Sequence, residues 1–148
     1  MSNKRKTIVV SGGFDPVHVG HLRMINEAAS FGDVIVVLNT DAWLVRKKGY
    51  VFMKWNDRAE ILKNFMNVTE VIPARDHDNT VCESLIDLKE VLDLDYFANG
   101  GDRKISNTPE MKVCESIGIE MVWNIGGGKI RSSSDLVSAS EKAKRTDG

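Results

Sequence analysis

The sequence predicts an α/β protein in which a five-stranded parallel sheet carries helices on both faces. Short runs rich in Val and Ile alternate with segments of helical periodicity along the chain. The first two runs, 7–11 and 33–39, are almost unbroken in apolar character, which is typical of parallel strands buried on both faces. The connections are short and no repeat or linker interrupts them, so residues 1–148 are expected to form a single domain.

Five apolar runs are expected to be strands, at 7–11, 33–39, 68–73, 95–99 and 119–123. The first helix is expected to end near Gly32, because glycine readily takes the left-handed conformation that follows many helices. Another helix is expected from the cap Thr108, with Pro109 at its first position and Gly118 at its end. A last helix is expected over 132–142.

Two further helices are expected to start at capping boxes. Asp57 and Glu60 mark the first, whose expected buried stripe is Ile61, Leu62, Phe65 and Met66. Thr80 and Glu83 mark the second, whose expected inward residues are Val81, Leu85, Leu88 and Leu92. The alternation predicts a Rossmann-like three-layer fold, in which ligands bind beyond the carboxyl ends of the strands. The loop after the first strand is therefore the predicted site.

Composition excludes several classes of protein. The formal net charge of −1 argues against general binding to nucleic acid, which needs a basic surface. No apolar run approaches membrane-spanning length, and no secretory signal is recognised, so a membrane partner is not expected. Cys82 and Cys114 show neither a disulfide framework nor zinc-ligand spacing. These features predict a cytoplasmic protein.

The turn after the first strand, "SGGFDPVHVGH", contains His18 and His21 three residues apart. Three interpretations compete: a metal pair, a phosphate cradle, and a tight turn with incidental histidines. The known metal motif on a helix has its histidines four apart with a glutamate between them, which this turn lacks, so no protein-held metal is expected. Gly12 and Gly13 allow the backbone to approach a ligand, and the following helix offers free N–H groups to an anion.

Five segments in order resemble the motifs of the cytidylyltransferase-like nucleotidyltransferases. They read "GGFDPVHVGHL", "NTDAWLVRKKG", "WNDRAEIL", "NGGDR" and "RSSSDLV". The first is similar to the family signature G-x-F-D-x-x-H-x-G-H. The branches that it most resembles are glycerol-3-phosphate cytidylyltransferase and heptose-1-phosphate adenylyltransferase. Any one of these motifs is a weak signal, whereas five at compatible spacing are a strong one.

The resemblance implies roles for residues in the first half of the chain. His18 and His21 would contact the nucleoside triphosphate and stabilise charge at its α-phosphate, and Lys48 would join them as a catalytic residue. The nucleotide would also run along Gly12, Gly13 and Phe14. The resemblance places Asp15, Lys48 and Arg58 at the acceptor substrate. Arg58 opens a helix, where a cation is unfavourable, and an anionic partner explains that position.

The resemblance also implies nucleotide contacts in the second half of the chain. Gly101 and Asp102 would border the base. Residues near the C-terminus would hold the β- and γ-phosphates: Arg131, Ser132, Ser133 and Ser134. The chain departs from the family at Gly127 and Gly128, where an arginine and a threonine are usual. Lys129 or Arg131 would have to supply the missing charge.

The implied activity is nucleotidyl transfer with Mg²⁺ bound to the triphosphate. CTP and a small phosphorylated alcohol, similar to glycerol 3-phosphate, are the favoured substrates because the chain length is near that of the single-domain glycerol-phosphate type. Transfer of AMP from ATP to a sugar phosphate such as heptose 1-phosphate is the alternative. A non-catalytic nucleotide sensor is the second alternative. A homodimer, common in the family, is also expected.

Overall fold

The central feature of the fold is a five-stranded sheet in the order β3-β2-β1-β4-β5, in which every neighbouring pair is parallel. The computed structural model describes residues 6–75, 80–99, 108–123 and 125. The strands are β1 (Thr7–Gly12), β2 (Asp33–Leu38), β3 (Val68–Pro73), β4 (Tyr96–Ala98) and β5 (Glu120–Val122). The predicted five-stranded parallel sheet is confirmed, with strand ends that differ by at most one residue.

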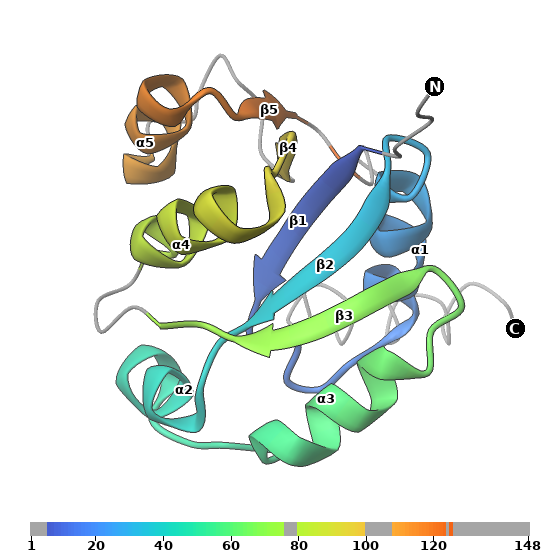
Figure 1. Cartoon of the computed structure of the whole chain (residues 1–148). Coiled ribbons are helices and arrows are strands. Elements are labelled where there is room, and N and C mark those ends of the chain that lie inside the picture. The colour runs from blue at the N-terminus through green and yellow to red at the C-terminus, as the bar shows by residue number, and fades with distance from the viewer. Residues whose placement is uncertain (1–5, 76–79, 100–107, 124, 126–148) are drawn as a thin grey trace, which may run out of the picture.

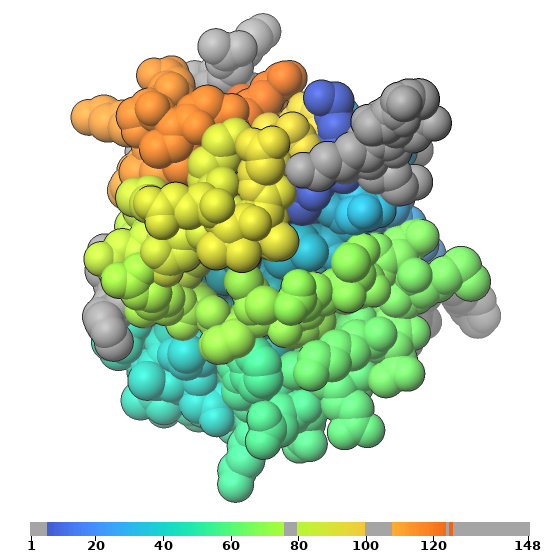
Figure 2. Space-filling model, viewed as in Figure 1, coloured from blue at the N-terminus to red at the C-terminus, as the bar shows by residue number. Residues whose placement is uncertain are grey.

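Helices cover both faces of this sheet (Figure 1). They are α1 (Val19–Ala28), α2 (Asp41–Lys48), α3 (Trp55–Lys63), α4 (Cys82–Leu92) and α5 (Pro109–Ile117). From the α4 side, only a narrow band of β1 and β2 remains visible in the space-filling view (Figure 2). Within the described ranges, no helix has the length and apolar character needed to cross a membrane.

Alternation along β1 separates two hydrophobic cores. Ile8 and Val10 point to the side of α1 and α3, while Val9 points to the side of α4 and α5. All three side chains are at most 1% exposed. A strand that is buried on both faces must be apolar at successive positions, which explains the unbroken run in the sequence.

The order of the strands places the end of β1 at the point where the chain changes direction across the sheet. From β1 the chain proceeds to β2 and β3 on one side, and it later returns to β4 on the other side of β1. Ligands of such sheets bind in the crevice at this switch point. The loop after β1, which ends at His18, and the first turn of α1, which contains His21, are therefore at the position that the sequence predicts for a site.

Gly32 does not terminate the first helix as expected. The helix α1 ends at Ala28 with Ala29 as a right-handed C-cap, and Gly32 lies three residues further on. A Cβ at Gly32 would lie 2.2 Å from the carbonyl oxygen of Lys6. The glycine is needed for this close backbone approach, which looks the same in the sequence as a helix end.

Both predicted capping boxes are corrected as well. Helix α3 begins at Trp55 after the N-cap Lys54, so Asp57 lies within its first turn and caps nothing. The helix ends at Lys63, and Met66, expected in the buried stripe, is 95% exposed beyond it. Helix α4 has Val81 as its N-cap, with no side-chain cap.

Candidate active site

The two histidines form the N-terminal cap of α1. His18 is the N-cap residue, and its Nδ1 accepts a hydrogen bond from the backbone N–H of Gly20 at 3.0 Å. His21 reaches back, and its Nδ1 accepts from the backbone N–H of His18 at 3.1 Å. The pair thus satisfies two N–H groups that a helix start leaves without partners. The spacing of three residues is the spacing of a capping box.

These bonds determine the tautomer of both rings. A ring nitrogen that accepts a hydrogen bond carries no proton, so each neutral imidazole holds its proton on Nε2. The rings stack with centroids 3.7 Å apart and an angle of 21° between planes. The Nε2 atom of His18 is shielded from solvent, with no partner within the described part of the chain. A buried donor without a partner is costly, and a ligand at this site would provide one.

Burial keeps both histidines neutral. Desolvation lowers the pKa of His18 below its usual 6.5. Desolvation, helped by the charge of the adjacent His18, lowers the pKa of His21 to about 3. At neutral pH the pair therefore presents Nε2–H donors without a net positive charge. Such donors suit the oxygens of a phosphate that is also attracted by the N-terminus of α1.

The residues before the histidines shape the turn. Phe14 has a positive φ of 49° and is 5% exposed, and its ring meets that of His21 edge to face at 4.6 Å. A Cβ at Gly13 would lie 3.0 Å from Leu44 Cδ2 and 3.1 Å from Trp43 Cζ3. Trp43, which the sequence analysis did not assign to the site, thus packs directly on the glycine turn. Phe14 supports the ring of His21 from the protein interior.

Asp15 links this turn to the segment after α2. Its side chain is 1% exposed, and its carboxylate accepts from the backbone N–H groups of Phe52 and Met53 at 2.7 and 2.5 Å. The ammonium of Lys48 donates to the carbonyl oxygen of Asp15 at 2.8 Å and lies 3.3 Å from its carboxylate. The side chain of Lys48 remains 29% exposed. These contacts give Asp15 a positioning role in the turn, and its expected contact with the acceptor stays a prediction.

Arg58, which the sequence assigns to the acceptor, makes its contacts in this structure with groups of the protein. Its side chain is fully buried, and Nη2 meets the carboxylate of Asp41 at 2.7 Å. The other donors reach three backbone carbonyls, those of Met53 at 2.8 Å, Gly13 at 2.7 Å and Asn39 at 2.8 Å. The expected anionic partner exists, but it is a residue of the protein. Arg58 holds together the segments that follow β1 and β2 and the segment before α3.

The described residues include no group of three or more His, Cys, Asp and Glu side chains that could hold a metal ion. The carboxylate of Asp15, next to the histidine turn, is engaged by two N–H groups and an ammonium.

The remaining predicted site residues lie outside the described residues. These are Gly101, Asp102, Arg131, Ser132, Ser133 and Ser134. The final predicted helix, 132–142, and the candidate charges Lys129 and Arg131 lie outside them as well. Their predicted roles stay predictions.

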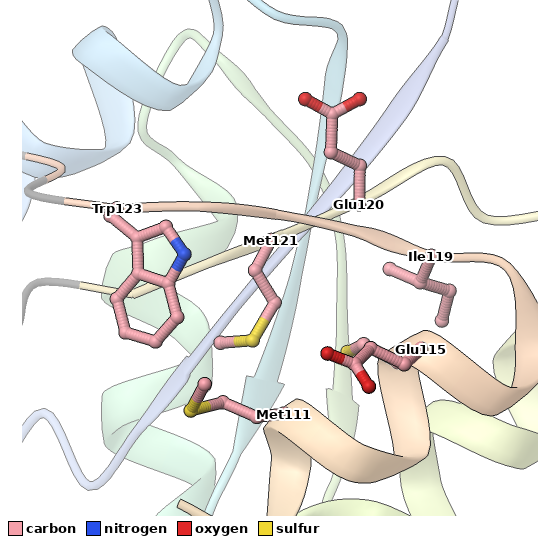
Figure 3. A pocket seen from close by; sticks show the side chains of 7 residues that line it. Met111, Glu115, Ile119, Glu120, Met121 and Trp123 are labelled. Atoms are coloured by element: carbon pink, nitrogen blue, oxygen red, sulfur yellow. The ribbon is translucent and has the colours of Figure 1, made fainter. Parts of the chain in front are cut away.

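A cavity of about 250 Å³ opens between α5 and β5, and none of the predicted site residues lines it. Met111 of α5 and Met121 and Trp123 of the β5 region point toward one another there, while Glu120 points to the opposite side (Figure 3). Two carboxylates and no cation line the cavity, so it is unsuited to a phosphate.

The cytidylyltransferase-like family model matches residues 9–124, which include the histidine turn, Lys48 and Arg58. This match spans most of the chain. The chain belongs to the cytidylyltransferase-like family. The resemblance noted in the sequence is thereby confirmed.

Curated relatives of the chain come from two branches. It is 30% identical over 141 residues to the bifunctional protein HldE of Citrifermentans bemidjiense, a match covering 92% of this chain and 27% of that protein. It is 30% identical over 100 residues to the glycerol-3-phosphate cytidylyltransferase of Bacillus spizizenii, a match covering 67% of this chain and 74% of that enzyme. The chain thus spans about a quarter of the bifunctional relative's length.

Solved structures confirm the fold of this family member. A lipopolysaccharide core biosynthesis protein from Thermoplasma volcanium superposes with a TM-score of 0.63 at 19% identity, covering 80% of this chain and 95% of that one. A putative nicotinate-nucleotide adenylyltransferase from Vibrio parahaemolyticus gives a TM-score of 0.59 at 17% identity, covering 94% and 88%. At these identities the likeness concerns the fold alone.

Proposed function

We propose that the protein transfers CMP from CTP to a small phosphorylated alcohol similar to glycerol 3-phosphate, with release of pyrophosphate. The observation that carries this proposal is the histidine pair, whose Nδ1 atoms are used by the cap and whose Nε2–H groups remain for a ligand. Family membership and the similarity to a glycerol-3-phosphate cytidylyltransferase support the reaction class.

In the proposed reaction, a phosphate oxygen of the acceptor attacks the α-phosphorus of the nucleotide. A new P–O bond forms as the bond from the α-phosphorus to the bridging oxygen breaks, and pyrophosphate leaves with that electron pair. His18 and His21 donate hydrogen bonds to the charged oxygens from a preorganised position, and Lys48 neutralises a phosphate. The protein needs no covalent intermediate for this chemistry.

The alternative is transfer of AMP from ATP to a sugar phosphate such as heptose 1-phosphate. It is favoured by the match to bifunctional HldE, which covers more of the chain than the match to the cytidylyltransferase. The described site does not discriminate between bases, because the predicted base-binding residues Gly101 and Asp102 lie outside it. Supplying CTP and ATP in parallel decides between the two reactions.

The deciding experiment measures pyrophosphate release with Mg²⁺ for each nucleotide and a panel of phosphorylated acceptors. The panel contains glycerol 3-phosphate, phosphocholine, phosphoethanolamine, heptose 1-phosphate, phosphopantetheine and FMN. Release that depends on one acceptor establishes the transferase and its substrates. Nucleotide binding without release for any acceptor would favour the sensor alternative.

Three further properties belong to the same proposal. Mg²⁺ would accompany the triphosphate with phosphate oxygens as ligands. A homodimer and a cytoplasmic location are proposed from the sequence and the family. Activity with and without EDTA, sedimentation and cell fractionation test them in turn.

A further inference from the structure

The segment between α2 and α3, residues 49–53, exposes two aromatic side chains beside the site. Tyr50 is 56% exposed and Phe52 is 68% exposed. Single apolar residues on a surface are common and need no explanation. Two exposed aromatic rings in one short segment are less common, and these two follow Lys48, a predicted catalytic residue.

The backbone of this segment is held firmly although its side chains are free of the core. Asp15 accepts the N–H groups of Phe52 and Met53, and Arg58 donates to the carbonyl oxygen of Met53 at 2.8 Å. Gly49 turns the chain out of α2 with a φ of 86°, which a side chain would make unfavourable. Both anchors, Asp15 and Arg58, also belong to or contact the histidine turn. The backbone that carries the exposed rings is therefore held at a fixed place relative to that turn.

Lys48 provides a positive charge at the base of the segment. Its ammonium lies 4.8 Å from the ring centroid of Tyr50 and is held by Asp15 on the other side. The ring and the carboxylate restrict the motion of a side chain that would otherwise sample many rotamers. A preset ammonium binds a phosphate at lower entropic cost than a free one.

The neighbouring hollow on α3 does not compete for the phosphate. It has a volume of about 650 Å³ and is open, and Met53 marks the end nearest the segment. Asp57 and Glu60 line it together with Asn64 and apolar side chains, and no cation does so. Repulsion from these carboxylates disfavours binding of a phosphate in the hollow itself.

We propose that Tyr50 and Phe52 recognise the carbon skeleton of the acceptor while Lys48 holds its phosphate. The inference rests on the proposed function and adds the side of the site where the acceptor binds. The ligand class is a phosphorylated polyol or sugar, whose C–H groups pack against the electron-rich faces of the two rings. Phe52 contributes contact only, whereas Tyr50 also positions the ammonium.

Acceptor binding measured by calorimetry tests this inference without requiring turnover. The probes are glycerol 3-phosphate and heptose 1-phosphate, added to protein saturated with a non-hydrolysable CTP or ATP analogue. Phe52→Ala is expected to weaken binding of the acceptor about tenfold and to leave binding of the analogue unchanged. Tyr50→Ala is expected to weaken it similarly, and Tyr50→Phe, which keeps the ring, to restore it.

Met66→Ala is the matched control. This side chain is apolar and 95% exposed, but it precedes β3 and so lies at the amino ends of the strands, opposite the site. Equal acceptor affinity of Phe52→Ala and wild type, or a wild type that binds neither acceptor, overturns the inference. Acceptor binding that is sensitive to Phe52 but gives no pyrophosphate release overturns the proposed function alone.

Discussion

Arg58 and His18 are both polar residues in the motifs at the end of β1 and at α3, yet their surroundings are opposite. Arg58 is fully buried and donates to four protein acceptors. His18 has one nitrogen engaged by its own helix and a shielded Nε2 without a partner within the described residues. The first arrangement is complete by itself, and the second is complete only with a ligand.

This difference separates residues that hold the site in shape from residues that would act on the substrate. Groups whose hydrogen bonds are all satisfied by the protein maintain the shape of the loops, and their loss is expected to reduce stability. Groups that keep an unused donor are expected to act on the substrate, and their loss is expected to reduce turnover. Substitutions on each side of this comparison test it.

The largest effect is expected for Arg58→Met. The change removes the charge that Asp41 meets and leaves the carbonyls of Gly13, Asn39 and Met53 without their donor. The Asp41 side chain is 42% exposed and can be solvated, whereas a buried acceptor left without its donor typically costs about 1–3 kcal/mol, so a loss of about 3 kcal/mol is expected for the three carbonyls together. Urea unfolding monitored by circular dichroism measures the loss. A variant as stable as wild type would contradict the role of Arg58 as a positioning residue.

The second effect concerns His18 and uses two replacements. The Oδ1 atom of His18→Asn is expected to occupy the place of Nδ1 and keep the cap, while the donor at Nε2 disappears. Turnover is expected to fall by about 10²–10³ with little change in stability. His18→Gln, which extends toward Nε2 but caps poorly, is expected to retain more turnover and lose more stability. The reverse order in kcat and in the urea midpoint would reject the division between the two nitrogens.

A smaller effect is expected for Gly13→Ala. The new methyl group would press against Leu44 and Trp43 at about 3 Å, and such overpacking typically costs about 1–3 kcal/mol. Thermal unfolding measures the change. Trp43→Phe in the same background is expected to recover part of it, because the smaller ring leaves room. An unchanged melting temperature in Gly13→Ala would show that α2, which contains Leu44 and Trp43, can shift to accept the methyl group without loss of stability.

The smallest effect is expected from pH in the neutral range. The pKa of His21 in the folded protein is about 3 and its ordinary value is 6.5. The unfolded chain therefore binds more protons than the folded one between these values, and stability falls as pH drops below about 6.5. Between pH 7 and 8 the pair stays neutral, so stability should be flat. His21→Asn is expected to reduce the acid-side slope, with the remainder due in part to His18, whose pKa is also lowered by burial, and an unaltered slope would assign it to other groups.

The fold was predictable from the sequence because its signals are periodic. Burial on both faces requires apolar residues at successive positions of β1 and β2, and this pattern is visible without a structure. Helix ends were less predictable. Gly32 accommodates a nearby carbonyl group and Asp57 lies inside a helix, although each resembles a boundary residue in the sequence.

The site was predictable only in part. The spacing of His18 and His21 indicates the turn and its anion chemistry, and the structure brings the rings together as a stacked pair. The roles of Asp15 and Arg58 were not visible, because most of their partners are backbone groups, which every residue has. Contacts to backbone leave no pattern of residue types in the sequence.

The anchoring of residues 49–53 through their backbone has a consequence for how the protein can change. Asp15 and Arg58 bind the backbone N–H and C=O groups of residues 52 and 53, which almost any residue provides. The side chains at positions 50 and 52 can therefore change without loss of these hydrogen bonds. We expect these two positions to act as an interchangeable module, open to redesign for a different acceptor while the histidine turn is left untouched.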